Sequence, residues 1–268
     1  MKPRPLTLPD FDEDSGIAYA LGERGELMED EMPRSLLGIL VLAISIIPAG
    51  LASGQPLLID GEILNYEIRY AGIPAGYATL EVECISDTAS IFRITSRARS
   101  NKIVSVFYEV DDRIVTEFDA SDLKPRYFEK SLKEGNYRKY EVISYGDRSD
   151  GSMRFEPGTF DVLTALYCVR GERLEVGQEL SLRLIEGEES YDARIKVLRR
   201  ETVKTGSKHF DCYVIEPEIK EGPFARKGRL LIWLTADDLK LPVQLKSEVA
   251  IGSFVACLSG TSYRGGAL

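Results

Sequence analysis

Apolar and polar side chains alternate with a period of two through most of the chain after Gly61. In the segment EILNYEIRYAG, every second residue is apolar: Leu64, Tyr66, Ile68 and Tyr70. Successive side chains of a strand point to opposite faces, so this pattern is typical of a strand with one buried and one solvated face. YATLEVECI and SIFRITSRAR continue the rhythm, with the turn GIPAG between the first two segments. Such a chain is constrained to fold largely as antiparallel sheet.

One stretch interrupts the alternation. In GTFDVLTALYCVRG the apolar residues recur at helical spacing, which predicts one short helix, Asp161–Val169, with Thr159 or Asp161 as its cap. Strand patterns resume afterwards, and RLLIWLT is apolar on both faces, which predicts a covered central strand. Further strands are expected near Phe107–Phe118, Tyr127–Lys133, Tyr137–Tyr145 and Met153–Phe155.

These patterns together predict an all-β fold. We count about a dozen strands, one helix and no alternation of helix with strand, which excludes a parallel α/β fold. We expect an antiparallel barrel-like or strongly curved sheet formed by a single β domain, 53–268, with its core in 59–258. A barrel of that size can enclose an apolar interior large enough for a ligand.

The N-terminal part carries an export pattern behind an acidic leader. Arg34 precedes the apolar run Leu36–Ile47, and the small residues Gly50 and Ala52 fit a cleavage site before Ser53. We therefore interpret 32–52 as a signal peptide and 1–31, with nine acidic residues, as a disordered or mis-assigned start. The run is shorter than the about 20 apolar residues of a spanning helix. We expect Sec-type export to the periplasm of a Gram-negative bacterium, with inner-membrane anchoring through 36–52 as the alternative.

Charge argues against nucleic acid as a partner. The net charge is −9, but much of it lies in the acidic leader, so the predicted β domain is nearly balanced. No basic field covers the domain as nucleic-acid binding would require.

We expect no catalytic residues, no metal site and no cofactor. The chain has a single histidine, His209, which excludes zinc sites that need two, and its neighbour Asp211 lacks the geometry of a triad. Adjacent Asp residues of a strand point to opposite faces, so neither Asp111–Asp112 nor Asp237–Asp238 forms a catalytic pair. The segments TADDLKLP and FDASDLKP, the latter with Asp119 and Asp122, are typical of turns, in which Asp accepts backbone N–H bonds. An Asp-dependent hydrolase is therefore the least favoured function.

The cysteines leave two interpretations open. In an oxidising compartment they can form bridges, but buried single thiols fit equally well. They do not form a Cys-x-x-Cys unit, so no redox or metal motif is present: Cys84, Cys168, Cys212 and Cys257.

The inner faces of the strands supply candidates for an apolar ligand pocket. Arg126, Lys130 and Arg138, in the basic and aromatic hairpin RYFEKSLKEGNYRKY, would hold an anionic head group at its rim. The rival interpretation is that the same apolar residues pack against each other as a core. The candidate lining is Leu64, Tyr66, Ile68, Leu80, Val82, Phe92, Ile94, Ile195, Val197, Ile232, Trp233 and Leu234.

Several longer segments, in this order, resemble a known family. They are GEILNYEIRYAGIPAG, FYEVDD, FDASDLKP, FDVLTALYCVR and KGRLLIWLTADDLKLPVQLKSEVAIGSF. The pattern is similar to the bacterial exported proteins catalogued as domain of unknown function 3108, over Gly61 to Leu258. The resemblance implies an exported envelope protein of mainly β structure, and it implies no activity.

We therefore expect a non-enzymatic envelope protein that binds an apolar or amphipathic component such as a lipid, lipoprotein or glycolipid, or an anionic glycan. Membrane contact is expected only through the signal segment or at the envelope surface. The alternative is a structural or adaptor protein that uses its sheet edges or the basic hairpin to hold an envelope partner.

Overall fold

The computed structural model describes residues 57–146, 158–187, 189–218, 228–249 and 252–264, which belong to one compact unit. These ranges cover most of the predicted β domain. The predicted leader (1–31) and signal peptide (32–52) lie outside the described residues, and so does the expected strand Met153–Phe155.

Strands dominate the described chain, and they pair into one sheet. Their bounds are β1 (Glu62–Tyr70), β2 (Ile73–Cys84), β3 (Ile91–Ser100), β4 (Asp111–Asp119), β5 (Pro125–Glu134), β6 (Tyr137–Ser144), β7 (Thr159–Phe160), β8 (Glu179–Glu186), β9 (Glu189–Thr205), β10 (Lys208–Glu218), β11 (Arg229–Thr235), β12 (Pro242–Val249) and β13 (Gly252–Tyr263). The order across the sheet is β6-β5-β4-β3-β2-β1-β13-β12-β11-β10-β9-β8-β7. A 3-10 turn, η2 (Val104–Val106), and a helix, α3 (Val162–Gly171), complete the described elements.

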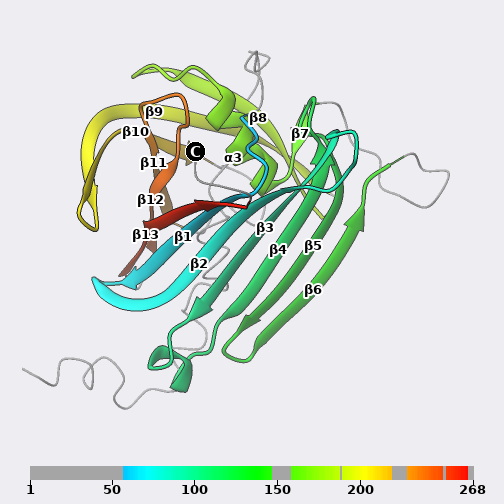
Figure 1. Cartoon of the computed structure of the whole chain (residues 1–268). Coiled ribbons are helices and arrows are strands. Elements are labelled where there is room, and N and C mark those ends of the chain that lie inside the picture. Colours follow the sequence, from blue (N-terminus) through cyan, green and yellow to red (C-terminus); the bar gives the residue numbers. More distant parts are fainter. Residues whose placement is uncertain (1–56, 147–157, 188, 219–227, 250–251, 265–268) are drawn as a thin grey trace, which may run out of the picture. The chain divides into compact units, whose positions relative to one another are not determined.

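The sheet is antiparallel apart from the short parallel pair β7–β8. The first and last strands, β1 and β13, pair at its middle, so the sheet consists of two meanders joined along that seam. Its edges, β6 and β7, do not pair with each other, so the sheet curls without closing (Figure 1). The predicted class, a barrel-like, strongly curved antiparallel sheet with one short helix, is confirmed.

The predicted helix and the predicted covered strand are present, and one predicted strand begins later than expected. The helix ends at Gly171, two residues later than expected, and Asp161 is its cap. The strand expected from Phe107 begins only at Asp111, because η2 and its flanking loop occupy the preceding residues. RLLIWLT is a covered central strand as predicted: β11 has neighbours on both sides, and Leu230 to Thr235 are all buried.

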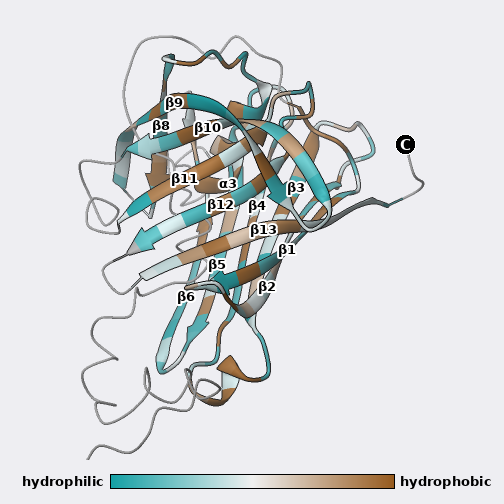
Figure 2. Ribbon diagram, turned by 90° about the vertical axis from the view of Figure 1, so that its left-hand side faces the viewer, coloured by the Kyte–Doolittle hydropathy of each residue, from teal (hydrophilic) through white to brown (hydrophobic). Residues whose placement is uncertain are grey.

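The alternation of the sequence decides which face of the sheet is buried. We call the face that carries Leu64, Tyr66 and Ile94 the inner face, and the opposite face, with Tyr77 and Arg97, the outer face. Register places Leu64 beside Leu80, and Val82 beside Ile94, so the apolar rows of neighbouring strands meet across the sheet. Figure 2 shows the resulting alternation of hydrophobic and hydrophilic residues along the strands.

A β-bulge changes the buried side in the β9–β10 hairpin. Register passes from Ile215↔Val197 to Val214↔Arg199, so Leu198 is an additional residue in β9. A bulge bends its strand and increases the local twist. On one side of it Val197 and Ile215 are buried on the inner face, and on the other side Val214 is buried on the outer face. The long hairpin therefore bends over, and β9 reaches β13 although three strands separate them in the sheet.

Helix α3 lies on the inner side, between the two halves of the curled sheet (Figure 1). Every residue from Val162 to Arg170 is buried, as expected for a helix enclosed by a core. The Asp161 carboxylate caps it, because Oδ1 accepts from the backbone N–H groups of Leu163 (2.8 Å) and Thr164 (3.1 Å). Oδ2 accepts from the Thr116 hydroxyl of β4 at 2.5 Å, which ties the start of the helix to the sheet. Burial raises the pKa of Asp161 above its ordinary value.

A buried ion pair fixes the other end of α3. The guanidinium of Arg170 donates to both carboxylate oxygens of Glu62 in β1, at 2.7 and 2.8 Å, and also to the carbonyl of Leu239. The Tyr167 hydroxyl donates to the same carboxylate at 2.9 Å. Desolvation alone would lower the pKa of Arg170, but the hydrogen bonds with Glu62, together with the electrostatic attraction of Tyr167, Glu62 and Tyr66, raise it. The charge is therefore held inside the sheet by a bidentate partner.

Candidate functional site

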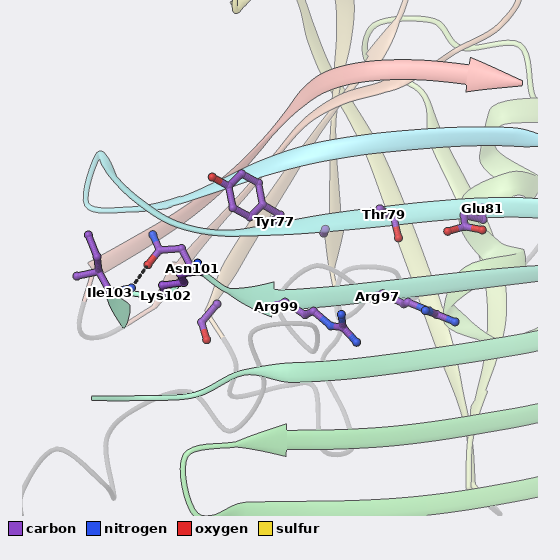
Figure 3. Close-up of a pocket in the computed structure, with 10 residues that line it drawn as sticks. Tyr77, Thr79, Glu81, Arg97, Arg99, Asn101, Lys102 and Ile103 are labelled. Atoms are coloured by element: carbon purple, nitrogen blue, oxygen red, sulfur yellow. Dashed lines mark hydrogen bonds between the residues drawn. The ribbon is translucent and has the colours of Figure 1, made fainter. Parts of the chain in front are cut away.

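An open hollow lies on the outer face of β2 and β3, beside the loop that follows β3 (Figure 3). Its volume is about 780 Å³. Polar, cationic and apolar side chains line it together: Tyr77, Ala78, Thr79, Glu81, Arg97, Arg99, Ser100, Asn101, Lys102 and Ile103.

The register of β2 and β3 builds the floor of this hollow. Tyr77 lies opposite Arg99, and Thr79 lies opposite Arg97, so their side chains share the outer face. The two strands approach closely at Gly76, where an added Cβ would lie 2.2 Å from the carbonyl oxygen of Arg99. Glycine is therefore required at the point where β2 passes the end of β3.

Asn101 fixes the loop that forms one wall. Its side-chain N–H group donates to the carbonyl of Pro74 at 2.7 Å, and its Oδ1 accepts from the N–H groups of Ile103 (3.0 Å) and Val104 (2.9 Å). The Ser105 hydroxyl donates to the Asn101 carbonyl at 2.7 Å. Ile103 is thus held in place although 68% of it is exposed to solvent.

Arg97 stands out among the cations of the outer face. Arg93 pairs with Glu117, Arg99 pairs with Asp111 at 2.9 Å, and Arg113 pairs with Glu129 at 2.5 Å. No carboxylate of the described residues lies within ion-pair distance of Arg97, which is exposed, and its cross-strand neighbour on β4 is Arg113. Like charges directly opposite each other in a sheet are unfavourable. An anion bound beside Arg97 would relieve that repulsion.

The residues predicted as a pocket lining lie mainly in the packed core. Tyr66, Ile68, Leu80, Phe92 and Ile94 are buried on the inner face, where α3 is enclosed. Desolvation by burial raises the pKa of Tyr66, whose hydroxyl donates to the Pro242 carbonyl at 2.8 Å. The packing interpretation accounts for this placement, and ligand binding by these residues stays a prediction.

Trp233 is placed elsewhere. Ala256, Leu245 and Ile232 lie opposite one another in β13, β12 and β11, so Ile232 continues the inner-face row. Trp233 is the next residue of β11 and therefore lies on the outer face. Its indole N–H donates to Glu201 at 2.7 Å, two strands away, under the bent β9–β10 hairpin.

The three predicted head-group cations do not converge. Arg126 is exposed at the start of β5 and binds Asp119 at 2.8 Å. Lys130 binds Glu186 at 2.7 Å, where the β8–β9 turn meets β5, with 14% of its side chain exposed. Arg138 donates to the carbonyls of Gly135 and Tyr137 in its own turn. They lie at opposite ends and in the middle of the β5–β6 hairpin.

Two acidic residues, Asp237 and Asp122, accept hydrogen bonds from the backbone of their own turns. Asp237 accepts from the N–H groups of Leu239 and Lys240, and Asp122 accepts from that of Lys124, which confirms the turn interpretation.

All four cysteines are free, and burial raises the pKa of the Cys168 and Cys212 thiols to about 12. In the described ranges, no three His, Cys, Asp or Glu side chains are grouped to hold a metal ion.

Sequence reasoning missed the outer hollow. Arg93, Arg97 and Arg99 were visible as the polar face of SIFRITSRAR, but whether Arg97 has a carboxylate partner in the described sheet depends on cross-strand register. The break in alternation after Ser100, at NKIVSVF, was the available signal for the loop.

The sequence profile of the family described as "Protein of unknown function (DUF3108)" matches residues 65–259. The chain belongs to the DUF3108 family. The match covers the strands of both meanders, from β1 to β13, and it confirms the resemblance inferred from the sequence. No curated protein matches this DUF3108 chain.

Three solved structures are similar to the DUF3108 chain at low sequence identity. A β-barrel-like protein of the family DUF1849 from Brucella abortus is 10% identical, with a TM-score of 0.49 over 77% of this chain and 99% of that chain. A Bacteroides fragilis protein with a YmcC-like fold, proposed to be exported, is 13% identical, with a TM-score of 0.35 over 82% and 99%. A proposed lipoprotein from Parabacteroides distasonis is 12% identical, with a TM-score of 0.34 over 81% and 100%.

Within the described ranges of this DUF3108 chain, no helix is both long and apolar enough to cross a membrane.

Proposed function

We propose that this DUF3108 protein is an exported, non-enzymatic envelope protein that binds an anionic amphipathic molecule, such as a lipid or glycolipid, in the outer hollow. Arg97 would hold the anionic head group, and Tyr77 and Ile103 would contact its apolar part. The signal pattern of 32–52 supports export to the periplasm, and anchoring through 36–52 is the alternative.

The observation that carries this proposal is an exposed arginine that has no carboxylate partner among the described residues, in a hollow that also exposes apolar surface. Tyr77 is 61% exposed and Ile103 is 68% exposed, beside Arg97 and Arg99. Binding sites for small molecules combine apolar walls with a few placed polar groups. A guanidinium can donate two parallel hydrogen bonds to a phosphate or carboxylate head group, and such charge-assisted bonds are strong.

The test is a titration of the full chain with dodecyl phosphate below its critical micelle concentration, followed by calorimetry. We expect Arg97→Gln to weaken binding about tenfold, the equivalent of about 1.4 kcal/mol for a charge-assisted contact. The matched control is Arg173→Gln, whose side chain is 89% exposed and pairs with Glu175 outside the hollow. Dodecyl maltoside has the same chain without the charge and should bind weakly to all three proteins. Equal affinity of the wild type and Arg97→Gln for dodecyl phosphate would refute the proposal.

One observation favours an adaptor as the second candidate function. In the described sheet β6 is an edge strand, and it exposes Tyr140 (71%) and Val142 (44%). An open edge can accept an added strand from a partner through main-chain hydrogen bonds. Replacing Tyr140 by Pro would prevent such pairing while leaving the outer hollow intact, so loss of partner capture without loss of amphiphile binding would favour this function.

A further inference from the structure

Exposed apolar side chains gather at one end of the sheet. The described residues contain nine large apolar side chains that are well exposed, and six of them lie at this end: Ile73, Tyr77, Ile103, Val106, Phe107 and Tyr137. They come from the first half of β2, the loop between β3 and β4, and the start of β6. We call this surface the apolar end. Its short turn η2 is the brown segment at the lower end of the sheet in Figure 2.

Hydrogen bonds join the three segments of the apolar end. The Asn101 N–H group donates to the Ala75 carbonyl at 2.8 Å, which ties the β3–β4 loop to β2. The Gly135 N–H group donates to the Glu109 carbonyl at 2.8 Å, which ties the same loop to the β5–β6 turn. The Tyr108 ring packs on Gly135, where an added Cβ would lie 2.6 Å away. The fold therefore presents these apolar side chains on a fixed platform.

The loop exposes its apolar residues to an unusual degree. Val106 is 77% exposed and Phe107 is 64% exposed, and neither lines the outer hollow. Isolated exposed apolar residues are common on soluble proteins, but a contiguous group on an ordered platform indicates a surface that is covered in use. Val104 to Val106 form a single turn, too short to be an amphipathic helix, so the apolar side chains project from the tip of a loop.

The charge around the apolar end is positive. Among the described residues, no carboxylate lies within ion-pair distance of Lys102 or Arg138, and Arg97 lies on the floor of the neighbouring hollow. Two exposed carboxylates of this end are paired, Glu109 with Lys133 at 2.7 Å and Asp111 with Arg99 at 2.9 Å, and the carboxylates of Asp112 and Glu134 are buried. Cations around an apolar tip are the pattern of a surface that lies in the interface of an anionic membrane.

We propose that the apolar end docks on the surface of an anionic lipid bilayer. Val106 and Phe107 enter the interfacial region, and Lys102 and Arg138 meet the head groups. The positive charge favours an anionic lipid surface over a second copy of the chain as the binding partner, because two copies would bring like charges together. The apolar end shares Tyr77, Lys102 and Ile103 with the outer hollow, but the inference does not depend on ligand binding there, because Val106, Phe107 and Arg138 do not line the hollow.

Tryptophan fluorescence of the full chain tests this docking at the loop itself. In a Trp233→Phe background, which removes the single native tryptophan, Phe107→Trp places the only indole at the tip. The control in the same background is Tyr140→Trp, on β6 and away from the apolar end. Residues 1–56 contain no tryptophan, so they do not contribute to the signal.

The vesicles contain equal parts of phosphatidylglycerol and phosphatidylcholine, with brominated acyl chains as quenchers. We expect the emission of the tryptophan at 107 to shift to the blue and to be quenched, whereas the tryptophan at 140 stays unchanged. Lys102→Gln with Arg138→Gln should weaken vesicle binding about 25-fold, at about fivefold for each cation near an anionic surface. Vesicles of phosphatidylcholine alone should bind weakly.

Unchanged emission of the tryptophan at 107 on addition of anionic vesicles would overturn the proposal. A blue shift that depends on protein concentration without vesicles would also overturn it, and would identify a second copy as the occupant. If the Trp233→Phe variant does not fold, co-sedimentation with anionic vesicles tests the docking in chains that keep Trp233. Val106→Ser with Phe107→Ser should then reduce the vesicle-bound fraction more than Val176→Ser with Tyr140→Ser, and equal binding of these two variants would count against docking.

Discussion

At the scale of single residues, Arg170 carries a charge into the interior of the sheet, where the Glu62 carboxylate compensates it. The side chains of both residues are at most 1% exposed, and Tyr167 and the Leu239 carbonyl use the remaining hydrogen-bonding capacity. A buried pair of this kind is weak evidence for net stabilisation, because desolvation offsets the attraction. Its structural effect is to connect α3 to β1 and to the β11–β12 turn, so that one ion pair fixes the position of the helix.

We predict that Arg170→Met lowers the free energy of unfolding by about 3–5 kcal/mol, because it leaves the Glu62 carboxylate buried without a cation. Glu62→Leu with Arg170→Met removes both charges and should recover part of that loss. The matched control, Arg173→Met, breaks only an exposed pair and should cost less than about 1 kcal/mol. Urea unfolding of the four proteins measures these differences. A double variant less stable than Arg170→Met alone would contradict the prediction.

At the scale of elements, close approach and bulges shape the sheet. At Gly76 the strand β2 passes so near to the end of β3 that no side chain fits, next to Tyr77 and Arg99 of the outer hollow. At Leu198 a bulge lets one hairpin bury different faces along its length. Neither feature follows from the alternation pattern, since both depend on which residue lies opposite which.

We predict that Gly76→Ala lowers the free energy of unfolding by about 1–3 kcal/mol, because the new methyl group would overlap the Arg99 carbonyl and push β3 away. It should also weaken the binding of dodecyl phosphate, since Arg97 and Arg99 move with β3. Gly260→Ala is the matched control: it is also a strand glycine, with no atom within 4 Å of an added Cβ. That variant should be neutral or slightly stabilised in thermal unfolding. Equal destabilisation of the two variants would show that the close approach at Gly76 is not what matters.

At the scale of the whole molecule, the sequence predicts much of the fold and little of the candidate site. Alternation predicts strands with one buried face, and helical spacing around Leu163 predicts α3 with its Asp161 cap, because both signals are local. The pairing of β1 with β13 and the bend at Leu198 depend on long-range contacts, which leave no local pattern. The ion pairs of the predicted head-group cations, Lys130 with Glu186 and Arg126 with Asp119, also depend on long-range contacts. The expectation that these cations converge on one ligand therefore missed them.

We propose that this molecule binds an amphipathic anion on its outer face, over β2 and β3, and not inside the curled sheet. Nuclear magnetic resonance of the isotope-labelled chain, titrated with dodecyl phosphate below its critical micelle concentration, tests it most directly. We predict that the backbone amide signals that move are concentrated in 76–81 and 97–103. Signals that move mainly in α3 and in the inner-face strands around Ile68 and Ile94 would contradict the claim and place the ligand in the interior.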